Sequence, residues 1–382
     1  MERSDEIYAR KAITLDGGSN RPGAAFASTS RDFSGALEPK VSVITPAYNA
    51  TKYICDALES IFAQTYQDFE VIVINDGSPD TEEFEQAIKP YRDRIVYLKQ
   101  ANRGPSAARN AGILRARGEY VAFLDSDDAW HRDYLAEQMN ILRESPSLDL
   151  TYSDVLHYTE SVSAGTPYSR KCPSNGPVTF ESLLREDVAI PTSQVVVRKR
   201  AVADAGWFDE ELWRAEDFDL WLRLAYQGAK ITYQKKLLGR HRVRSESLAG
   251  DNIKMLAAMI QVLLKLERSV QLPADTQALL RQKIAQTQAQ WDIEQGKFCL
   301  YHGRFQEAAE LFEKANGLFR RTKLRLILLG LKVAPRLTSC SLRIFEHWRT
   351  RWNSRRAVTR KGRALGEASL SKLFGNKTAE ES

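Results

Sequence analysis

The feature that most constrains the fold is an alternation of short apolar segments with amphipathic ones between Val41 and Leu124. Short apolar strands separated by helices of roughly 10–15 residues indicate βαβ units, and therefore a parallel sheet. The first of these helices has one apolar face, formed by Ile54, Leu58, Ile61 and Phe62. We expect strands over residues 41–45, 70–74, 95–98 and 120–124, and helices over residues 52–64, 81–89 and 106–117.

Polar residues follow three of these strands, at the edge where parallel sheets bind their ligands. The last strand runs directly into Asp125, Asp127 and Asp128. Three carboxylates this close repel one another unless a cation lies between them, and Mg²⁺ or Mn²⁺ prefers oxygen ligands completed by water and phosphates. The turn therefore predicts a divalent metal and a substrate with a diphosphate. The alternative is a plain turn whose Asp and Ser residues cap the next helix.

The sequence from residue 150 to residue 242 is less regular, and we expect it to complete the same domain on its acceptor side. Beyond Asp251 the sequence becomes helical and rich in Gln and Leu, which indicates a separate module. We expect helices over residues 134–143 and 218–226, and strands over residues 150–155, 194–198 and 231–238.

The helical module contains one segment that fits a tetratricopeptide-type helix pair. An ordinary helical hairpin with alanines at its close contacts fits the same segment equally well, since a single repeat is not stable alone. The small and aromatic positions concerned are Gly296, Gly303, Ala308, Phe312 and Ala315.

The positive charge of the chain is concentrated near its C-terminus. Fourteen Lys and Arg and one Glu lie between Arg320 and Arg363, so this segment has a net charge of +13. Because the whole chain has a net charge of +6, the remainder carries −7. The basic balance therefore describes one segment and does not imply nucleic acid.

The same segment has the pattern of a basic amphipathic helix with aromatic anchors. We expect it to attach to an anionic cytoplasmic membrane surface through residues 323–363. Docking of the same face onto the helical module is the alternative. The apolar positions are Leu337, Cys340, Ile344, Trp348 and Trp352, and the basic ones between them include Arg336, Arg343 and Arg355.

The cysteines and the N-terminus indicate a cytoplasmic protein, either free or peripheral on the inner face of the cell membrane. Cys55, Cys172, Cys299 and Cys340 lack metal-binding spacing, which favours free thiols in a reducing compartment. The first residues lack a signal peptide, and the longest apolar run falls short of the roughly 18–20 residues of a spanning helix. The expected divisions are a disordered leader (1–39), a main domain (40–250), the helical module (251–322) and a basic tail (323–382).

Four segments together resemble family 2 glycosyltransferases of the GT-A fold. They read V-S-V-I-T-P-A-Y-N at 41–49, V-I-V-I-N-D-G-S-P-D at 71–80, N-R-G-P-S-A-A-R-N-A-G at 102–112 and F-L-D-S-D-D at 123–128. The resemblance implies a GT-A domain from residue 41 to about 250, with a mixed, mainly parallel sheet flanked by helices, followed by the C-terminal α-helical module. It also implies an inverting transfer of a sugar from a nucleoside-diphosphate sugar to a hydroxyl of a glycan or lipid-linked acceptor, as in cell-wall and exopolysaccharide biosynthesis. Mn²⁺ or Mg²⁺ would bind the diphosphate.

The resemblance assigns the donor nucleotide to the ends of the first strands. It implies that Asp76 contacts the nucleobase, with Thr45, Pro46 and Tyr48 at the same end. A plain turn is the alternative for Asp76. Arg103 is expected to meet the donor phosphates, unless it only solvates the helix that follows.

Within the acidic turn, the resemblance implies that Asp127 and Asp128 contact the ribose and the metal, with Asp125 supporting them on the nucleotide side. The sequence does not decide which of them touches the ion first. Arg109 is a further candidate for the donor phosphates.

A general base is expected at Asp217, next to Glu216, because transfer is aided by removing the proton of the attacking hydroxyl. The motif E-D-x-D-L-W resembles the acceptor-side motif of the family. The alternative is that both acids only favour the positive end of a helix. Asp219 faces elsewhere on that helix and is a poorer candidate.

Two further positions follow from the resemblance. Trp207 is expected to stack on the acceptor sugar, with core packing as the alternative. Arg242 and Arg244 are expected in a lid over the diphosphate. Arg244 stands where the family often has His, so an electrostatic clamp is expected in place of a histidine ligand, unless His241 substitutes.

Two other classes of protein remain as alternatives. A nucleotidyltransferase would have a Gly-rich loop after the first strand, where this chain has Pro46-Ala47-Tyr48-Asn49. An inactive scaffold is opposed by the presence of the four acidic residues assigned above. A P-loop ATPase is excluded because the motif G-x-x-x-x-G-K-[ST] is absent from the sequence.

Overall fold

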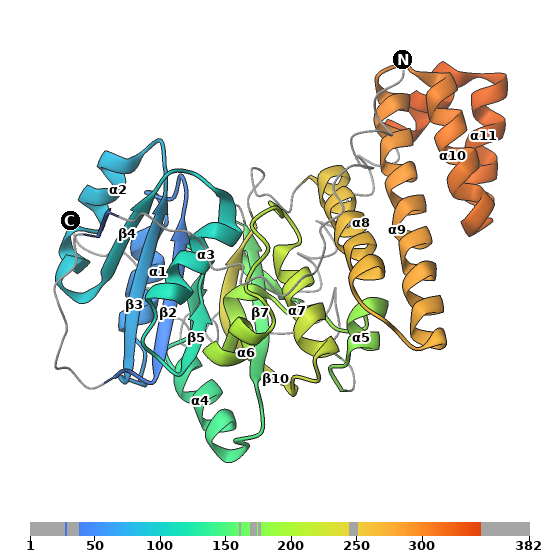
Figure 1. Cartoon of the computed structure of the whole chain (residues 1–382). Coiled ribbons are helices and arrows are strands. Elements are labelled where there is room, and N and C mark those ends of the chain that lie inside the picture. Colours follow the sequence, from blue (N-terminus) through green and yellow to red (C-terminus); the bar gives the residue numbers. More distant parts are fainter. Residues whose placement is uncertain are drawn as a thin grey trace.

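The computed structural model describes residues 27–28, 38–159, 162–168, 174, 177–243 and 251–344. One mixed sheet forms the centre of the larger part of the molecule (Figure 1). Its strands lie in the order β1-β4-β3-β2-β5-β9-β7-β10-β6, with β8 beside β7. Their bounds are β1 Ala27–Ser28, β2 Val41–Ala47, β3 Phe69–Asp76, β4 Val96–Gln100, β5 Tyr120–Phe123, β6 Ala129–Trp130, β7 Leu150–Thr159, β8 Val162–Pro167, β9 Val195–Arg198 and β10 Ile231–Arg242.

Strands β2, β3, β4 and β5 form the parallel part of the sheet that the alternating pattern predicts. Strand β2 pairs in parallel with β3 and β5, and β3 pairs in parallel with β4. In the second half β9 runs antiparallel to β5 and β7, while β7 and β10 are parallel. The carboxyl ends of β2, β3 and β5 therefore meet at one edge, which we call the rim of the sheet.

Helices cover both faces of this sheet. Helices α1, α2 and α4 pack on one face, and α3, α5, α6 and α7 pack on the other. In α1 the expected apolar face is confirmed, since Ile54, Leu58 and Ile61 are buried and Phe62 is partly buried. The bounds are α1 Ile54–Phe62, α2 Thr81–Ala87, α3 Gly104–Arg115, α4 Tyr134–Glu144, α5 Phe180–Arg185, α6 Lys199–Asp204 and α7 Glu216–Tyr226, with short 3₁₀ helices at Lys89–Arg94 and Thr192–Gln194.

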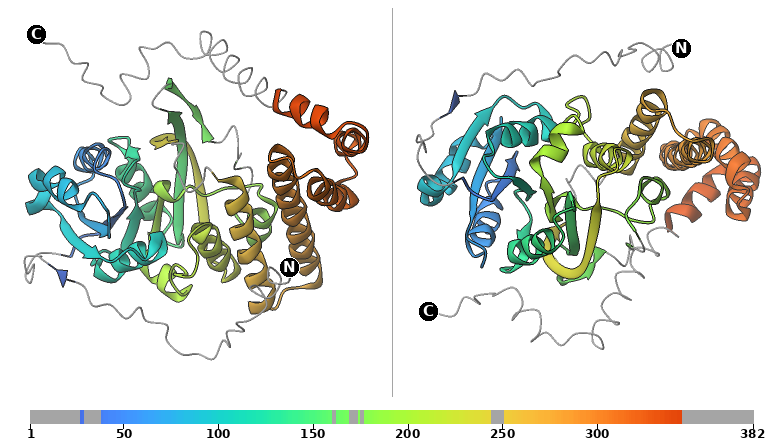
Figure 2. Two further views of the ribbon diagram at one scale, coloured as in Figure 1. Left: turned by 90° about the horizontal axis from the view of Figure 1, so that it is seen from above. Right: turned by 60° about the horizontal axis from the view of Figure 1, so that its bottom comes forward.

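The C-terminal helices fall into two packing groups. Helix α8 (Asn252–Ser269) and the beginning of α9 (Ala274–Tyr301) join the core beside the sheet through Val262, Leu263 and Leu280. The end of α9 forms a separate core with α10 (Phe305–Phe319) and α11 (Thr322–Val333). The packing boundary thus lies within α9, later than the expected division at residue 251. Figure 2 shows the second group at the end of the molecule far from β2–β4.

Helices α9 and α10 form a close hairpin. A Cβ atom on Gly296 would lie 2.8 Å from the ring of Phe312, so the two helices approach at a residue without a side chain. Gly303 has a φ of +77° in the connecting turn, and Ala308 and Ala315 are fully buried. These contacts suit both the tetratricopeptide-type unit and the ordinary hairpin.

Several expectations fall on residues that the structure does not describe. They are most of the leader, the tail beyond residue 344, Cys172 and Arg244. From the leader, Ala27–Ser28 pairs antiparallel with β4. Among the described helices, none combines the length and the apolar character needed to cross a membrane.

Candidate active site

The end of β3 places Asp76 against the N-terminus of α3. Its carboxylate is 4% exposed. One oxygen, Oδ1, accepts hydrogen bonds from Gln100 Nε2 at 2.7 Å and from the backbone N–H of Arg103 at 3.0 Å. The other, Oδ2, accepts from the N–H of Gly104 at 2.9 Å. Because the first N–H groups of a helix lack partners within it, Asp76 fixes the start of α3 at the rim.

The expected donor-side residues of β2 lie next to Asp76. In the register of the sheet Ala47 is opposite Asn75, so Tyr48 follows β2 beside the position where Asp76 ends β3. Thr45 is fully buried, whereas the ring of Tyr48 is half-exposed. The structure therefore brings the residues predicted for the nucleotide to one place on the rim.

The two arginines of the N-R-G-P-S-A-A-R motif have different surroundings. Arg103 is largely exposed and pairs with Glu210 at 2.5 Å. Arg109 is buried, with Nη2 at 2.9 Å from Asp125 and Nη1 at 2.7 Å from Glu216. Burial acts to lower the pKa of Arg109, but the two carboxylates outweigh it and the pKa is raised, so Arg109 stays charged. Arg109 therefore joins the acidic turn to the start of α7.

The acidic turn after β5 is held by neighbouring backbone and side chains. The N–H of Asp125 donates to Ser193 Oγ at 3.1 Å, and Asp128 accepts from the N–H of Arg242 at 3.0 Å. Asp128 is 2% exposed. Burial raises the pKa of Asp128 to about 7, and the charges of Asp127 and Asp125 act in the same direction. Negative charge is thus in excess at this turn.

The composition of the turn fits a small divalent cation. No three His, Cys, Asp or Glu side chains in the described ranges gather as a metal cluster. Mg²⁺ and Mn²⁺ do not require one, because substrate phosphates and water complete a shell begun by one or two carboxylates. The donors present, Asp127 and Asp128, are oxygen ligands, and a cation between them would stabilise the charged form of Asp128, which burial disfavours.

Helix α7 begins with the predicted acid pair. Ala215, directly before it, has a φ of +55°, a left-handed conformation that turns the chain into the helix. Glu216 is buried; burial raises its pKa and the charge of Asp217 adds to this, while Arg109 opposes it. Asp217 is more open, and its Oδ2 accepts a hydrogen bond from Thr192 Oγ1 at 2.8 Å. Of the two acids, Asp217 is the oriented and accessible one.

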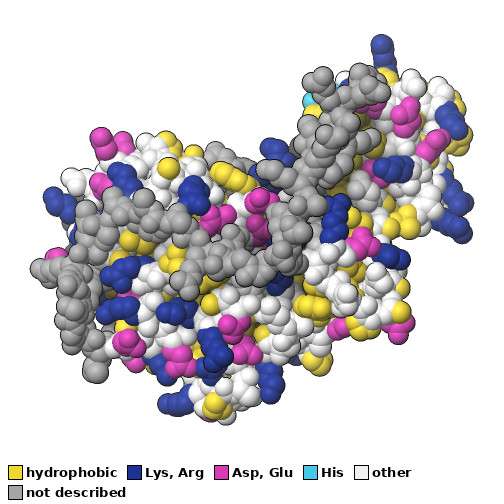
Figure 3. Space-filling model, viewed as in Figure 1, with side chains coloured by type: hydrophobic (Ala, Val, Ile, Leu, Met, Phe, Trp, Pro, Cys, Tyr) yellow, Lys and Arg dark blue, Asp and Glu magenta, His cyan; other side chains and the backbone are white. Residues whose placement is uncertain are grey.

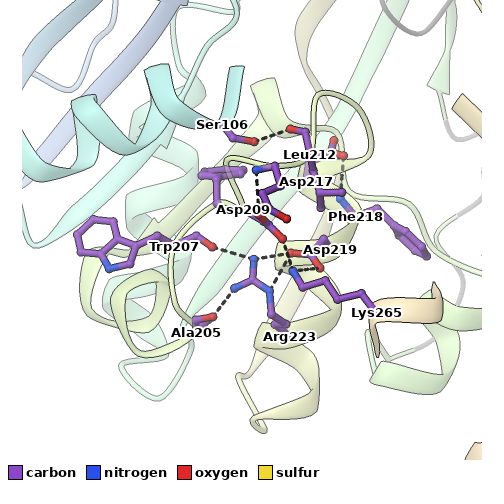
Figure 4. Close-up of polar contacts among 12 residues, drawn as sticks. Ser106, Ala205, Trp207, Asp209, Leu212, Asp217, Phe218, Asp219, Arg223 and Lys265 are labelled. Carbon is purple, nitrogen blue, oxygen red and sulfur yellow. Dashed lines mark hydrogen bonds and ion pairs between the residues drawn. The ribbon is translucent and has the colours of Figure 1, made fainter. Parts of the chain in front are cut away.

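Asp219 has a structural environment, in agreement with the expectation that it faces elsewhere. It is 4% exposed and pairs with Arg223 at 2.6 Å and with Lys265 of α8 at 2.9 Å. Lys265 also pairs with Asp209 at 2.6 Å. Figure 4 shows these residues as one network that joins α7, α8 and the loop before α7.

Trp207 lies in that loop with a φ of +66°. Its carbonyl accepts a hydrogen bond from Arg223, and its indole packs against the core. In Figure 4 the indole points away from Asp217. The arrangement matches the packing alternative, and the acceptor contact of Trp207 stays a prediction.

Arg242 ends β10 beside the acidic turn. Its Nε donates to the carbonyl of Asp127 at 3.2 Å, and its Nη2 pairs with Asp56 at 3.0 Å. The side chain of Arg242 therefore lies against the acidic turn, and its role at the diphosphate stays a prediction. His241 makes a contact with a second histidine. Arg244, the other expected clamp residue, lies outside the described part of the chain.

The residues that sequence reasoning missed, Thr192 and Ser193, come from the irregular stretch and hold Asp217 and the acidic turn. Arg109 was a candidate for the donor phosphates, but its ion pairs with Asp125 and Glu216 were not foreseen. The only local signal was the polar Pro191-Thr192-Ser193 run before β9. Their partners lie far away in the sequence, so no spacing rule identifies them.

A mainly parallel sheet with acidic side chains gathered at its carboxyl edge defines the class of α/β domains that bind nucleotides at that edge. The model of the family described as "Glycosyl transferase family 2" matches residues 42–185. A putative teichuronic acid biosynthesis glycosyltransferase of Bacillus subtilis, TuaG, is 30% identical over 220 residues, which cover 57% of this chain and 84% of that protein. The chain belongs to glycosyltransferase family 2.

Other relatives share only part of their length with this chain. An uncharacterized glycosyltransferase of Rickettsia felis is 31% identical over 212 residues, which cover 54% of this chain and 35% of the relative. The chain thus spans about a third of that protein. Because the match leaves most of that relative uncovered, functions of its remaining parts do not carry over.

Solved structures confirm the GT-A fold. TarS 1–349 of S. aureus, in complex with UDP-GlcNAc, superposes with a TM-score of 0.52 at 22% identity, covering 80% of this chain and 91% of that one. A mannosyltransferase of Pyrobaculum calidifontis, in complex with GDP-Man and Mn²⁺, gives a TM-score of 0.51 at 18% identity, covering 81% and 88%. The predictions of a mixed α/β sheet and of a C-terminal helical part are confirmed.

Proposed function

We propose that this protein is a metal-dependent, inverting glycosyltransferase that moves a sugar from a nucleoside-diphosphate donor to a hydroxyl of a glycan or lipid-linked acceptor. The supporting observation is the buried Arg109, whose ion pairs hold the acidic turn and the start of α7 together at the rim. The names of the relatives support a role in bacterial cell-wall or exopolysaccharide synthesis, since TuaG is described as a teichuronic acid enzyme.

On the donor side, Asp76 would accept a hydrogen bond from the nucleobase, with Thr45, Pro46 and Tyr48 around it. Asp125 and Asp127 would contact the rest of the nucleotide. Mn²⁺ or Mg²⁺ would be held by Asp127 and Asp128, and when bound it neutralises charge on the diphosphate.

Asp217 would take the proton from the attacking hydroxyl of the acceptor. Thr192 Oγ1 donates to Oδ2 of Asp217 and the backbone N–H of Phe218 donates to Oδ1, so both oxygens are oriented, and each can accept one more hydrogen bond from a hydroxyl. Glu216 would stay bound to Arg109 and hold the start of the helix. Attack from the face opposite the leaving group inverts the configuration at the sugar carbon.

A panel of UDP-, GDP- and dTDP-sugars tests the donor side by thermal shift, with and without Mn²⁺. Binding of the correct donor raises the melting temperature, because a ligand that binds only the folded state stabilises it. No stabilisation by any donor would contradict the proposal. Formation of a nucleoside triphosphate and a sugar 1-phosphate when pyrophosphate is added to the donor would identify a nucleotidyltransferase. Binding without any turnover would identify an inactive scaffold.

The stereochemistry is tested separately. With the donor found in the panel, the anomeric signal of the product is recorded by proton NMR before mutarotation. Inversion is expected for one displacement assisted by Asp217. A retained configuration would rule out this mechanism while leaving the class of transferase intact.

We also propose that the C-terminal helices bring the enzyme to an anionic membrane surface, where a lipid-linked acceptor would lie. Residues 320–344 contain seven Lys or Arg and no Asp or Glu. In this region Leu326, Leu329 and Val333 are 63%, 60% and 77% exposed. Figure 3 shows Lys and Arg side chains along the outer edge of the part formed by α10 and α11. A basic helix with exposed leucines suits the interface of an anionic bilayer.

Flotation of the full chain with phosphatidylglycerol vesicles tests this attachment, and phosphatidylcholine vesicles serve as the control. We expect binding to the anionic vesicles only, and weaker binding when Leu326, Leu329 and Val333 are all changed to Ser. Equal behaviour of the variant and the unchanged chain, or no binding by either, would contradict the proposal.

A further inference from the structure

Trp213 is an aromatic side chain left half-exposed at the rim. Its exposed fraction is 50%, whereas Trp130 and Trp221 of the same domain are 3% and 1% exposed. An indole left in water gives up the free energy that its burial would contribute. Such exposure is common for a side chain on a loosely held loop. The exposure of Trp213 therefore points to a binding role only if its loop is held firmly.

The loop that carries Trp213 is fixed to α3 by several hydrogen bonds. Ser106 Oγ donates to the carbonyl of Leu212, the residue before Trp213, at 2.9 Å. The side chain of Asn110 and the backbone of Phe208 exchange two hydrogen bonds, of 2.9 and 3.0 Å. All these contacts are buried. Trp213 is therefore held in an exposed position by a rigid loop.

The ring of Trp213 lies against the start of α3. A Cβ atom on Gly104 would be 3.2–3.4 Å from three of its ring atoms, so the indole lies over a position that has no side chain. The N–H of this same Gly104 donates to Asp76 Oδ2. The indole of Trp213 thus lies over Gly104, whose N–H binds the buried carboxylate. Tyr48 follows β2 directly after Ala47, the register partner of Asn75, the residue before Asp76.

The Asp76 carboxylate can accept one more hydrogen bond. Asp76 Oδ1 already accepts two, from Gln100 and from the N–H of Arg103, while Oδ2 accepts one. A carboxylate oxygen accepts about two. The remaining acceptor position on Oδ2 is suited to a flat ring that carries an N–H.

From this geometry we propose that Trp213 forms the second aromatic wall of the nucleobase pocket, opposite Tyr48, and that Asp76 selects a base with a ring N–H. Uracil, thymine and guanine have this group, and adenine and cytosine lack it. The inference rests on the proposed donor site. It assigns a donor-side aromatic contact to Trp213, a residue that the sequence pattern did not single out.

Isothermal titration calorimetry of the full chain with UDP, GDP, ADP and pyrophosphate, in the presence of Mg²⁺, tests this assignment. We expect Trp213→Ala to weaken binding of the preferred nucleoside diphosphate roughly tenfold, the usual effect of losing a stacked base. Binding of pyrophosphate, which has no base, should not change. Trp213→Phe should retain most of the affinity, and ADP should bind more weakly than UDP or GDP.

Leu114→Ala is the matched control, because Leu114 is 43% exposed on the far end of α3 and touches none of these groups. If Trp213→Ala bound the nucleoside diphosphate as tightly as the unchanged chain, the assignment would be overturned. The same conclusion would hold if this variant kept its nucleotide affinity and lost only the transfer to a sugar acceptor. Tighter binding of ADP would overturn the choice of base. Absence of any nucleotide binding by the unchanged chain would instead remove the proposed function itself.

Discussion

The rim of the sheet and the outer face of α11 differ in which side chains they bury and which they expose. At the rim, charged groups are buried and paired, as Arg109 is with Asp125 and Glu216. On α11, apolar groups such as Leu326 and Leu329 lie in water beside cations. Burying charge and exposing leucine both cost free energy, so neither arrangement serves stability alone.

The difference indicates where each region makes its contacts. The rim holds its polar groups in fixed positions for a small polar ligand that comes to them. The face of α11 offers a broad surface with no fixed polar partner, as expected for contact with a large and variable surface. Substitutions should therefore act on chemistry and folding at the rim, and on attachment at α11.

The largest effect is expected for Asp217→Asn. General-base assistance contributes about 10²- to 10⁴-fold, so transfer should fall by that factor while the donor affinity stays unchanged. Initial rates and calorimetric donor titration measure the two. Asp204→Asn, at an exposed position on α6, is the control. Turnover unchanged in Asp217→Asn would remove it from the role of base.

Arg109→Met should destabilise the fold by about 3–5 kcal/mol, because it leaves two buried carboxylates without their cation. Urea unfolding gives the free energy of unfolding directly. The control, Arg103→Met, breaks an exposed pair and should cost less than about 1 kcal/mol. Similar losses for the two arginines would show that the burial of Arg109 carries no special cost.

Lys265→Met tests whether α8 belongs to the main domain. It removes the cation from Asp209 and leaves Asp219 with Arg223 only, so we expect a loss of about 1–2 kcal/mol in unfolding free energy. Lys254→Met, in the same helix, breaks an exposed pair with Asp251 and should change little. Equal melting temperatures for both variants would show that the contacts of Lys265 do not contribute to the stability of the main domain, and that α8 is not part of it.

Gly296→Ala places a Cβ atom 2.8 Å from the ring of Phe312 and should destabilise the α9–α10 hairpin by about 1–2 kcal/mol. The matched change, Gly317→Ala in α10, meets no atom within 4 Å and should stabilise by up to about 1 kcal/mol. Unfolding followed by circular dichroism distinguishes the two. A stabilised Gly296→Ala would mean that the helices can move apart without cost.

The smallest effect on folding is expected for Leu329→Ser. The side chain is 60% exposed, so the unfolding free energy should change by less than about 0.5 kcal/mol while vesicle binding weakens. Leu331→Ser, two residues further on and buried, should instead destabilise the fold. If Leu329→Ser destabilised as much as Leu331→Ser, the face of α11 would be packed rather than free.

The helices and strands that could be predicted from the sequence are those whose residues form a local hydrophobic pattern. The strand expected at 120–124 is found at Tyr120–Phe123, and the helix expected at 106–117 is found at Gly104–Arg115. Helices α5 and α6 have six residues each, too few for a periodic pattern to reveal them. Short segments of this kind owe their structure to packing against the rest of the domain.

The candidate site was predictable where its residues follow strands and unpredictable where they meet across the chain. Asp76 and the acidic turn could be predicted because they directly follow apolar strands. The pairing of Arg109 with Glu216 joins residues 107 positions apart, and burial of an arginine depends on both partners being present. The exposure of the loop tryptophans has the same origin, because the loop conformation leaves Trp213 half-exposed while Trp207 packs against the core.

Helix α9 runs without a break for 28 residues, a length of about 42 Å at a rise of 1.5 Å per residue. One end is anchored beside α8 and the other carries the hairpin. A continuous helix leaves no linker about which the two ends could swivel, so it acts as a spacer of fixed length. Any surface touched by α11 would therefore stand at a set distance from the rim, and only an acceptor whose tether matches that distance could reach Asp217.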